Sequence, residues 1–255
     1  MSAALDSFAF APRWIPGRST PALQSGEVHL WTLPLAASPE RLARFLPLLS
    51  DDEQAQAVRF VRPDLTRRFI MRRALLRLVL SGYCGTLGDP LAFEWNNFGK
   101  PYLGGVHRAT GILFNTSQSH EVALLAVSRD HEIGVDVEHV RSVSEFESLS
   151  RRFFMEAEVQ SIMTWSPQDR LRAFFWIWTG KEAILKACGI GIATGLRRAT
   201  IEIAANGPRL GYLDSTLGSA EHWQLTAFWP QPDYVATLAA SVAQRELRFF
   251  CWEVD

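Results

Sequence analysis

A long helix predicted between Ser166 and Gly189 constrains the fold of this 255-residue chain more than any other segment. Pro167 suits the first helical position, where an N–H would have no helical partner, and Gly189 is a natural C-terminal cap. At about 100° per residue, one stripe of the helix is apolar and must be buried against another element. The stripe consists of Leu171, Phe174, Phe175, Trp178 and Leu185.

Segments typical of strands lie on both sides of this helix. Their apolar patterns predict strands over 27–33, 91–95, 112–115, 122–128 and 132–138, and again over 200–203, 223–229 and 234–241. The tail, which ends near Trp252, is predicted to be another antiparallel strand. Further helices are predicted to begin at Ser38, to cover 51–60 and to cover 65–80.

The order of a helix followed by strands occurs in both halves of the chain. It indicates an α+β fold, built as a pseudo-dimer of two similar α+β subdomains that meet near residue 130. We therefore expect an N-terminal subdomain over residues 1–130 and a C-terminal subdomain over residues 131–255. A chain of this length buries enough surface to fold without disulfides.

Composition excludes several classes of protein. The 26 basic and 27 acidic side chains nearly cancel, so we expect no broad electrostatic binding to nucleic acid. No apolar run is longer than that of residues 122–127, which is far shorter than the ~20 residues of a membrane span, and we expect neither a membrane segment nor a signal peptide. The scattered cysteines, Cys84, Cys188 and Cys251, indicate reduced thiols and a cytoplasmic location.

Three carboxylates lie where an isolated negative charge is costly. Glu182 is in the middle of the apolar stripe, with Lys186 one turn further on, and a carboxylate that faces a core needs a cation or a metal. Asp136 and Glu138 share one face of the strand at 132–138, where they repel each other unless a cation lies between them. Oxygen ligands favour Mg²⁺. A solvated helix end and a solvated strand face are the alternatives.

Basic residues provide a second indication. Arg59, Arg62, five arginines of the helix at 65–80 and Lys100 in a Gly-Lys-Pro turn suit phosphate groups, although most belong on an ordinary surface. Together with the carboxylates they indicate a magnesium-dependent enzyme with a phosphate-rich substrate. The motifs of serine hydrolases, zinc proteases and P-loop enzymes are absent from the sequence. His139 is predicted to point away from Asp136, and Gly180 has no evident purpose inside its helix.

Two segments resemble the signature motifs of the 4′-phosphopantetheinyl transferases. They are Ile133-Gly134-Val135-Asp136-Val137-Glu138 and, about forty residues later, Trp178-Thr179-Gly180-Lys181-Glu182-Ala183-Ile184-Leu185-Lys186. Two shorter matches precede them, Phe98-Gly99-Lys100-Pro101 and Phe114-Asn115-Thr116-Ser117. The resemblance covers roughly residues 55–200 and is to the surfactin-synthetase-type group, whose members are monomers built as a pseudo-dimer of two α+β halves.

The resemblance implies a reaction and roles for the acidic residues. The phosphopantetheine arm of coenzyme A would be transferred to a serine of an apo acyl or peptidyl carrier protein, with release of 3′,5′-ADP. Asp136, Glu138 and Glu182 would hold Mg²⁺, or Mn²⁺ in its place. Glu182 would also be the base that takes the serine proton. Lys186, and in second place Lys181, would neutralise the transferring phosphate.

The resemblance also assigns a coenzyme A site to the first subdomain. The matching positions are Lys100, Asn115, Ser117 and Arg73, with Arg73 as the first candidate for the 3′-phosphate and Arg68 as the second. The family usually has Ser-His where this chain has Ser117-Gln118. Gln118 can donate a hydrogen bond to a phosphate but carries no charge. His120, two residues further on, would replace the missing histidine only if the turn after Ser117 were shifted.

The segment 151–165, from Arg151 to Trp165, corresponds to the carrier-docking region of the family. Phe153, Phe154 and Met155 would cover the apolar part of a carrier helix, and Arg151 and Arg152 would meet its acidic residues. The alternative is that the aromatic residues belong to the core. Trp178 would pack beneath the metal site.

Two other functions are compatible with the same residues. One is a magnesium-dependent phosphohydrolase of a nucleotide or pyrophosphate, with water as the nucleophile. The other is a carrier-binding relative without turnover, against which the presence of Glu182 argues.

Overall fold

Helices and strands alternate along the chain, which is a mixed α+β protein as expected. The computed structural model describes residues 5, 7–86, 90–143, 145–191, 195–204, 206–241 and 246–253. None of the described helices is both long enough and apolar enough to cross a membrane.

The strands are short and the helices vary in length. The strands are β1 (Ile15–Gly17), β2 (Glu27–Pro34), β3 (Phe93–Trp95), β4 (Pro101–Leu103), β5 (Leu113–Ser119), β6 (Val122–Ser128), β7 (Ile133–His139), β8 (Ala199–Ala204), β9 (Gly207–Leu213), β10 (Trp223–Phe228), β11 (Tyr234–Ser241) and β12 (Glu246–Trp252). The α-helices are α2 (Pro39–Phe45), α3 (Asp51–Ala57), α4 (Pro63–Cys84), α5 (Phe146–Phe153), α6 (Glu156–Thr164) and α7 (Pro167–Ala187). Short 3-10 helices cover Leu46–Leu48, Gly105–Thr110, Leu196–Arg198, Ser215–Leu217 and Ala220–His222.

The main helices begin where the sequence predicts. Pro167 is the first residue of α7, Ser166 precedes it as N-cap, and Gly189 follows the helix with a φ of +72°. This left-handed backbone is one that glycine adopts without steric cost. Ser38 caps α2 by accepting a hydrogen bond from the Arg41 amide at 3.3 Å. Local signals therefore suffice to begin and end these helices.

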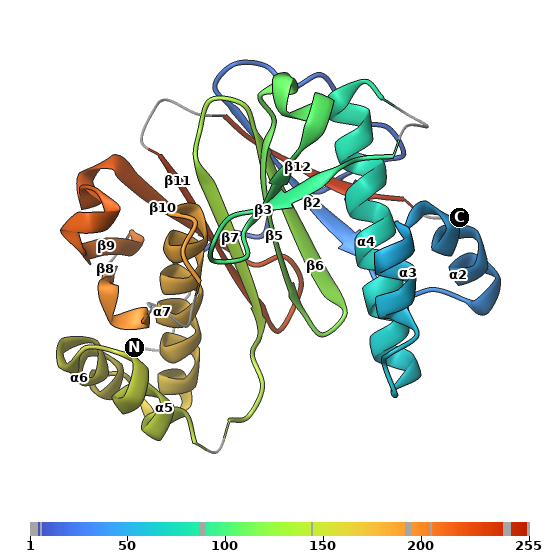
Figure 1. Ribbon diagram of the computed structural model, residues 1–255. Helices are drawn as coiled ribbons and strands as arrows, with labels where there is room; N and C mark the ends of the chain where they lie inside the picture. Colours follow the sequence, from blue (N-terminus) through green and yellow to red (C-terminus); the bar gives the residue numbers. More distant parts are fainter. Residues whose placement is uncertain are drawn as a thin grey trace.

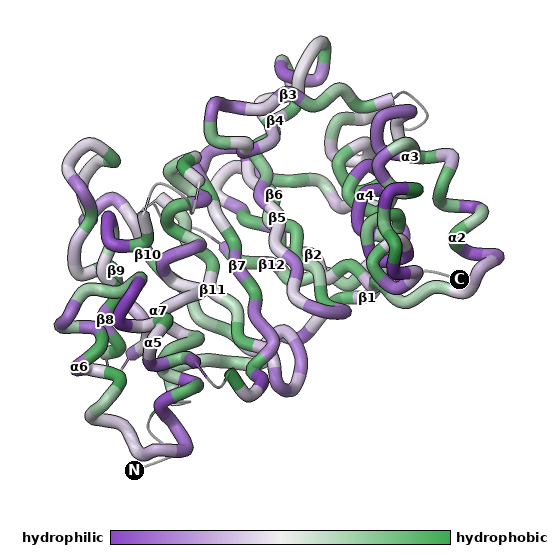
Figure 2. Tube along the Cα trace, turned by 60° about the horizontal axis from the view of Figure 1, so that its bottom comes forward, coloured by the Kyte–Doolittle hydropathy of each residue, from purple (hydrophilic) through white to green (hydrophobic). Residues whose placement is uncertain are grey.

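Two sheets pack face to face between two long helices (Figure 1). One sheet has the strand order β1-β12-β2-β6-β5 and the other the order β10-β11-β7. The facing sides share one apolar core, to which Leu30, Leu124, Val135 and Leu238 belong. Helix α4 covers the outer face of the first sheet and α7 that of the second. In Figure 2, β6 is largely apolar whereas α4 alternates between hydrophilic and apolar residues.

The last strand differs from the prediction. β12 runs parallel to both of its neighbours, β1 and β2, and belongs to the first sheet. The antiparallel tail predicted near Trp252 is therefore wrong, and the unit expected over residues 131–255 lacks its final strand. The reason is aromatic packing, because Phe250 stacks on Trp31 with ring centroids 4.9 Å apart and Trp252 lies 5.7 Å from the same ring.

The order of elements is the same in the two halves. In the first half, β2 is followed by two short helices, the long helix α4, the hairpin β3–β4 and the hairpin β5–β6. In the second half, β7 is followed by α5 and α6, the long helix α7, the hairpin β8–β9 and the hairpin β10–β11. The first strand pairs with the last in both halves, in the orders β2-β6-β5 and β7-β11-β10.

Two glycines allow α7 to lie close to its neighbours. A Cβ atom on Gly134 of β7 would lie 2.1 Å from the carbonyl oxygen of Ala183, so only glycine fits beneath the helix there. On another side of α7, a Cβ atom on Gly180 would lie 3.1 Å from the side chain of Ile201 in β8. Gly180 therefore packs directly against Ile201, and close packing is the usual purpose of a glycine inside a helix.

Candidate active site

Three carboxylates and one ammonium group meet between β7 and α7. The Nζ of Lys186 donates to Asp136 Oδ1 at 2.5 Å and lies 3.4 Å from Glu182 Oε2. Asp136 is 2% exposed and Glu182 is 6% exposed, so both carboxylates are buried. Glu138 lies two residues along β7, on the same face as Asp136. The burial expected for Glu182 is confirmed.

Side chains of β5 hold β7 in register, although no backbone ladder joins the two strands. Three alternate side chains of β5 accept hydrogen bonds from amides of β7. Asn115 Oδ1 accepts from Val135 at 2.9 Å, Ser117 Oγ from Val137 at 3.3 Å and Ser119 Oγ from His139 at 3.1 Å. The polar residues of β5 therefore fix the strand that carries the acids.

Two of these serines also orient the carboxylates. Ser117 Oγ donates to Asp136 Oδ1 at 2.7 Å, and Ser119 Oγ donates to Glu138 Oε2 at 2.8 Å. Lys186 Nζ in turn donates to Ser117 Oγ at 3.2 Å. Ser119 was not among the predicted site residues. Its signal in the sequence is the alternation of polar residues at 115, 117 and 119, which matches the alternation of the acidic strand.

The site holds more negative than positive charge. Burial raises the pKa of Glu182 to about 8 and that of Glu138 to about 7, and the nearby Asp136 contributes to both shifts. Burial alone would lower the pKa of Lys186, but Asp136 and Glu182 raise it above the usual value. A further cation would relieve this repulsion.

The oxygen atoms present fit a hard divalent cation. Asp136 Oδ2 is buried and has no hydrogen-bond partner among the described residues, which is costly for a carboxylate oxygen unless a cation meets it. Carboxylate oxygens are the donors that Mg²⁺ prefers. Within the described ranges, no group of three acidic, histidine or cysteine side chains is arranged to hold an ion as it stands. Lys186 is instead bonded to Asp136 and Glu182.

The expectation for Lys181 does not agree with its placement. Its side chain is 0% exposed, and its Nζ lies 2.7 Å from Glu158 Oε2 and 2.9 Å from the carbonyl oxygen of Leu196. Residues adjacent in a helix point about 100° apart, so Lys181 faces α6 and β8 while Glu182 faces β7. Lys181 is therefore a buried structural residue and leaves the set of candidate phosphate ligands.

The two arginine candidates differ in their partners. Arg73 lies 2.9 Å from Glu53 and is mostly buried on the side of α4 that faces α3. Arg68 donates to Glu121 at 2.8 Å, in the β5–β6 turn next to Ser119. Arg68, the second candidate for the 3′-phosphate, is thus the arginine that lies at the end of β5. Gln118 donates to the carbonyl oxygen of His120 at 3.3 Å.

The remaining predicted residues lie at the end of α7, at the end of β7 and within α7. Lys100 Nζ donates to the carbonyl oxygen of Ala187, at the end of α7, at 3.0 Å. His139 is half-buried between the rings of His120 and Tyr234, with centroid distances of 4.8 and 4.7 Å. Trp178 packs against Phe174 at 5.6 Å.

The segment 151–165 forms the end of α5, the turn after it and α6. Phe154 is 1% exposed and stacks on Phe174 at 5.3 Å, so it belongs to the core. Phe153 packs on Trp178 at 5.9 Å. Met155 is 41% exposed, and Arg151 and Arg152 are also exposed. Only part of the predicted docking set is available to a partner.

The fold and the site define an α+β protein with a buried acidic centre between a strand and a helix. The family model described as the 4′-phosphopantetheinyl transferase superfamily matches residues 132–239, a range that contains all four central residues. A 4′-phosphopantetheinyl transferase of Nostoc sp., HetI, is 37% identical over 228 residues, which cover 89% of this chain and 93% of the relative. The chain belongs to the 4′-phosphopantetheinyl transferase family and is an enzyme of that class.

More distant relatives agree with this assignment. A putative 4′-phosphopantetheinyl transferase of Synechocystis sp., slr0495, is 34% identical over 180 residues, or 71% of this chain and 72% of the relative. The 4′-phosphopantetheinyl transferase Sfp of Bacillus subtilis is 24% identical over 170 residues, or 67% of this chain and 73% of the relative.

Proposed function

We propose that this enzyme transfers the 4′-phosphopantetheine arm of coenzyme A to a serine hydroxyl of an apo acyl or peptidyl carrier protein, with Mg²⁺. The observation that carries the proposal is the buried cluster of Asp136, Glu138, Glu182 and Lys186, in which Asp136 Oδ2 has no partner among the described residues. The family assignment supports the reaction, and the donor atoms support the metal.

In this reaction the serine Oγ attacks the phosphorus that bears the pantetheine arm. The bond from that phosphorus to the bridging oxygen breaks, and 3′,5′-ADP leaves. Glu182 accepts the serine proton, directly or through a water molecule. The ammonium of Lys186 neutralises the transferring phosphate.

Asp136, Glu138 and Glu182 would hold the divalent cation. When bound, Mg²⁺ or Mn²⁺ supplies positive charge to the pyrophosphate as charge builds up on the leaving group. Ser117 and Ser119 orient two of these carboxylates through the hydrogen bonds that fix β5 to β7. Asn115 also supports β7, because its Oδ1 accepts the hydrogen bond from the Val135 amide.

Coenzyme A would lie on the side of the first sheet. Lys100, Ser117 and Gln118 are the proposed contacts, and Arg68 is a better placed partner for the 3′-phosphate than Arg73. Arg68 lies at the β5–β6 turn, whereas Arg73 is bound to Glu53. Because Arg68 is paired with Glu121, the phosphate would replace that carboxylate as its partner.

We also infer that the two halves form a pseudo-dimer of one α+β unit. The repeated order of elements and the matching strand orders support this inference. A single chain then provides both halves of the site, which is why we propose a monomer. The three free thiols, Cys84, Cys188 and Cys251, support a cytoplasmic location.

The carrier would dock at the turn between α5 and α6. Met155 offers exposed apolar surface there, and Arg151 and Arg152 offer positive charge beside it. Carrier helices with acidic residues around an apolar stripe would complement this surface.

Intact-mass spectrometry of an apo carrier protein tests the proposal. The carrier is incubated with the enzyme, coenzyme A and Mg²⁺, alongside a reaction with EDTA and a reaction with a carrier whose acceptor serine is changed to alanine. We expect the mass to rise by one phosphopantetheine only in the complete reaction. Hydrolysis of coenzyme A to 4′-phosphopantetheine and 3′,5′-ADP without any gain in carrier mass would instead identify a phosphohydrolase.

A further inference from the structure

Asn96 joins two parts of the chain that are far apart in sequence. Its Oδ1 accepts hydrogen bonds from the amides of Phe98 and Lys100, both at 2.9 Å. Its Nδ2 donates to the carbonyl oxygen of Gly189 at 2.6 Å. One side chain therefore shapes the Gly99-Lys100-Pro101 turn and at the same time holds the segment that follows α7.

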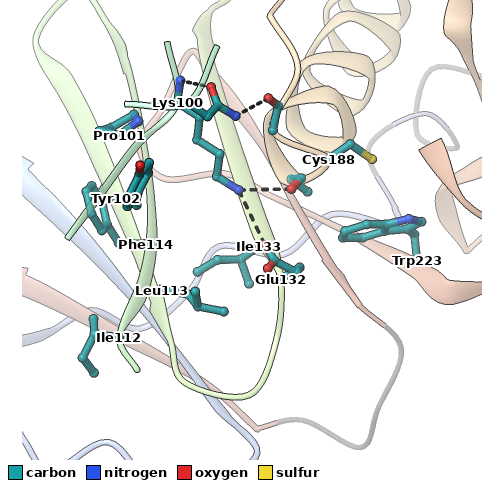
Figure 3. Close-up of a pocket in the computed structure, with 13 residues that line it drawn as sticks. Lys100, Pro101, Tyr102, Ile112, Leu113, Phe114, Glu132, Ile133, Cys188 and Trp223 are labelled. Atoms are coloured by element: carbon teal, nitrogen blue, oxygen red, sulfur yellow. Dashed lines mark hydrogen bonds and ion pairs between the residues drawn. The ribbon is translucent and has the colours of Figure 1, made fainter. Parts of the chain in front are cut away.

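The end of α7 needs such donors. The last carbonyl groups of a helix have no partner within the helix, and when they are partly buried they must find one elsewhere. Lys100 provides one, because its Nζ donates to the carbonyl oxygen of Ala187 at 3.0 Å, and Asn96 holds the carbonyl oxygen of Gly189, two residues beyond the helix. Figure 3 shows Lys100 extending toward Glu132, beside Cys188 at the end of the helix. The cation also suits the negative end of the helix dipole.

The fit between the two segments is close. A Cβ atom on Gly189 would lie 3.1 Å from Asn96 Nδ2, and one on Gly191 would lie 3.4 Å from the carbonyl oxygen of Phe98. A cavity of about 360 Å³ lies beside these contacts and is lined by both halves of the chain, including Lys100, Glu132 and Trp223. A molecule bound in this cavity would touch the turn and the end of α7 together.

The contact acts on the helix that carries the proposed chemistry. Glu182 and Lys186 lie in the last two turns of α7, directly before the carbonyl groups held by Lys100 and Asn96. Gly134 sets the distance of α7 from β7, but it provides no hydrogen bond that prevents the helix from sliding along the strand. Lys186 of α7 is bonded to Asp136 of β7, and Asn96 adds a second restraint, because it anchors the segment after the helix to a turn of the first half.

We propose that Asn96 is a positioning residue that couples the Gly99-Lys100-Pro101 turn to the carboxyl end of α7, and so places Glu182 and Lys186 against the substrate. The inference rests on the proposed transfer reaction. A displacement of about 1 Å in a reacting group can reduce a rate by roughly a hundredfold. A single hydrogen bond at this junction can thus have a catalytic effect larger than its effect on stability.

Two variants separate the two contacts of Asn96, and a third is their control. Asn96→Asp keeps an oxygen for the amides of Phe98 and Lys100 but replaces the donor to Gly189 with a second acceptor. Asn96→Ala removes both contacts. Asn97→Ala is the matched control, because Asn97 is the exposed neighbour in the same turn. The measurements are kcat and KM for coenzyme A, the melting temperature, and hydrogen exchange at residues 184–190.

We expect Asn96→Asp to lower kcat/KM by about tenfold or more, with kcat falling as well, and to speed exchange at the end of α7. Asn97→Ala should match the wild type in both respects. The proposal is overturned if Asn96→Asp retains kcat/KM within about twofold of the wild type, or if only its melting temperature changes. If Asn96→Ala fails to fold, the aspartate variant decides.

Failure of the proposed function gives a different result. If the wild type modifies no carrier, the transfer reaction is wrong, and exchange at residues 184–190 then tests the coupling alone. Unchanged exchange in Asn96→Asp would contradict the coupling whether or not the wild type is active.

Discussion

Among the single residues, Glu182 is the one whose chemistry is most sharply testable. Glu182→Gln keeps the shape of the side chain but removes the proposed base and one cation ligand. We expect transfer to fall by about a thousandfold, because general-base catalysis and metal binding are both lost. Burial disfavours the charge on Glu182, so the melting temperature of the metal-free variant should be unchanged or higher.

Steady-state kinetics with carrier and coenzyme A, together with a thermal melt, measure these two effects. Glu246→Gln is the matched control, since Glu246 is exposed on β12. Transfer by Glu182→Gln at a rate close to that of the control would contradict the role of Glu182. A large drop in melting temperature would show that the residue is structural.

The sequence predicted the burial of Glu182 but not that of Lys181, and both results have the same reason. The apolar stripe of α7 shows one buried face, and Glu182 lies in it. Periodicity does not show that α7 is enclosed on a second side, where α6 and β8 cover Lys181 and Glu158 forms its ion pair. The ion pair of Arg73 with Glu53 could not be predicted from periodicity either, because it joins α4 to α3.

At the scale of elements, two glycines on different sides of α7 should differ in their tolerance of alanine. Gly134→Ala places a methyl group against the backbone of α7, which has no room to move, so we expect a loss of at least about 3 kcal/mol of stability. Gly180→Ala meets only the side chain of Ile201, and alanine favours the helix by about 1 kcal/mol. Its net effect should be within about 1 kcal/mol of zero.

Urea unfolding of the two variants and the wild type measures both values. The order of the two effects is the critical result. Equal stabilities for Gly134→Ala and Gly180→Ala would show that α7 shifts freely over β7, and the close seat of the helix would then have no energetic importance.

Another element-scale contact joins β2 to α4 through a buried histidine. His29 is 0% exposed, and its ring nitrogens lie 2.6 Å from the Tyr83 hydroxyl and 3.0 Å from Glu27 Oε2. Burial lowers the pKa of His29 below its usual 6.5, although Glu27 opposes the shift. The unfolded chain therefore binds a proton more readily than the native one as the pH falls below about 6.5.

This linkage predicts that His29 costs stability on acidification. Its contribution to the free energy of unfolding is fully present above pH 6.5 and decreases as the pH falls through the lower pKa of the folded state. His29→Gln should weaken this decrease between about pH 7.5 and 5, whereas His222→Gln, at an exposed position, should leave it unchanged. Denaturant unfolding at several pH values gives the difference directly, and identical slopes for His29→Gln and the wild type would refute the assignment.

Local signals explain why most elements were predictable. Caps define the ends of α7, and strict alternation defines β7. β5 extends four residues beyond its predicted end because its polar residues face β7, where they replace a backbone ladder. No local pattern identifies such a contact, because the partner strand lies about twenty residues away in the sequence.

For the whole molecule, the boundary between the halves is not a single cut in the chain. The order of elements repeats from β7 onward, but β12 returns to the first sheet and lies between β1 and β2. Residues 1–130 alone would leave one edge of β2 unpaired and Trp31 without the ring of Phe250. We therefore expect this fragment not to unfold cooperatively.

The register suggests how to restore the missing strand. Val28 of β2 pairs with Ser128 at the end of β6, and Glu27 pairs with Glu246 at the start of β12, so both ends lie at the same end of β2. The end of β6 and the start of β12 flank β2 and are separated by two strand spacings, about 10 Å. A flexible linker of about eight residues from residue 130 to residues 246–253 would therefore suffice.

We expect the linked chain to show a cooperative urea transition, followed by far-ultraviolet circular dichroism and tryptophan fluorescence, that residues 1–130 alone lack. The same chain with Phe250→Ser is the control, because it keeps the strand but loses the stacking on Trp31. A cooperative transition in residues 1–130 without β12 would show that the first half folds independently. If the linked chain and its Phe250→Ser control were equally disordered, the second sheet, which shares the core of Leu30 and Leu124, would be the missing requirement.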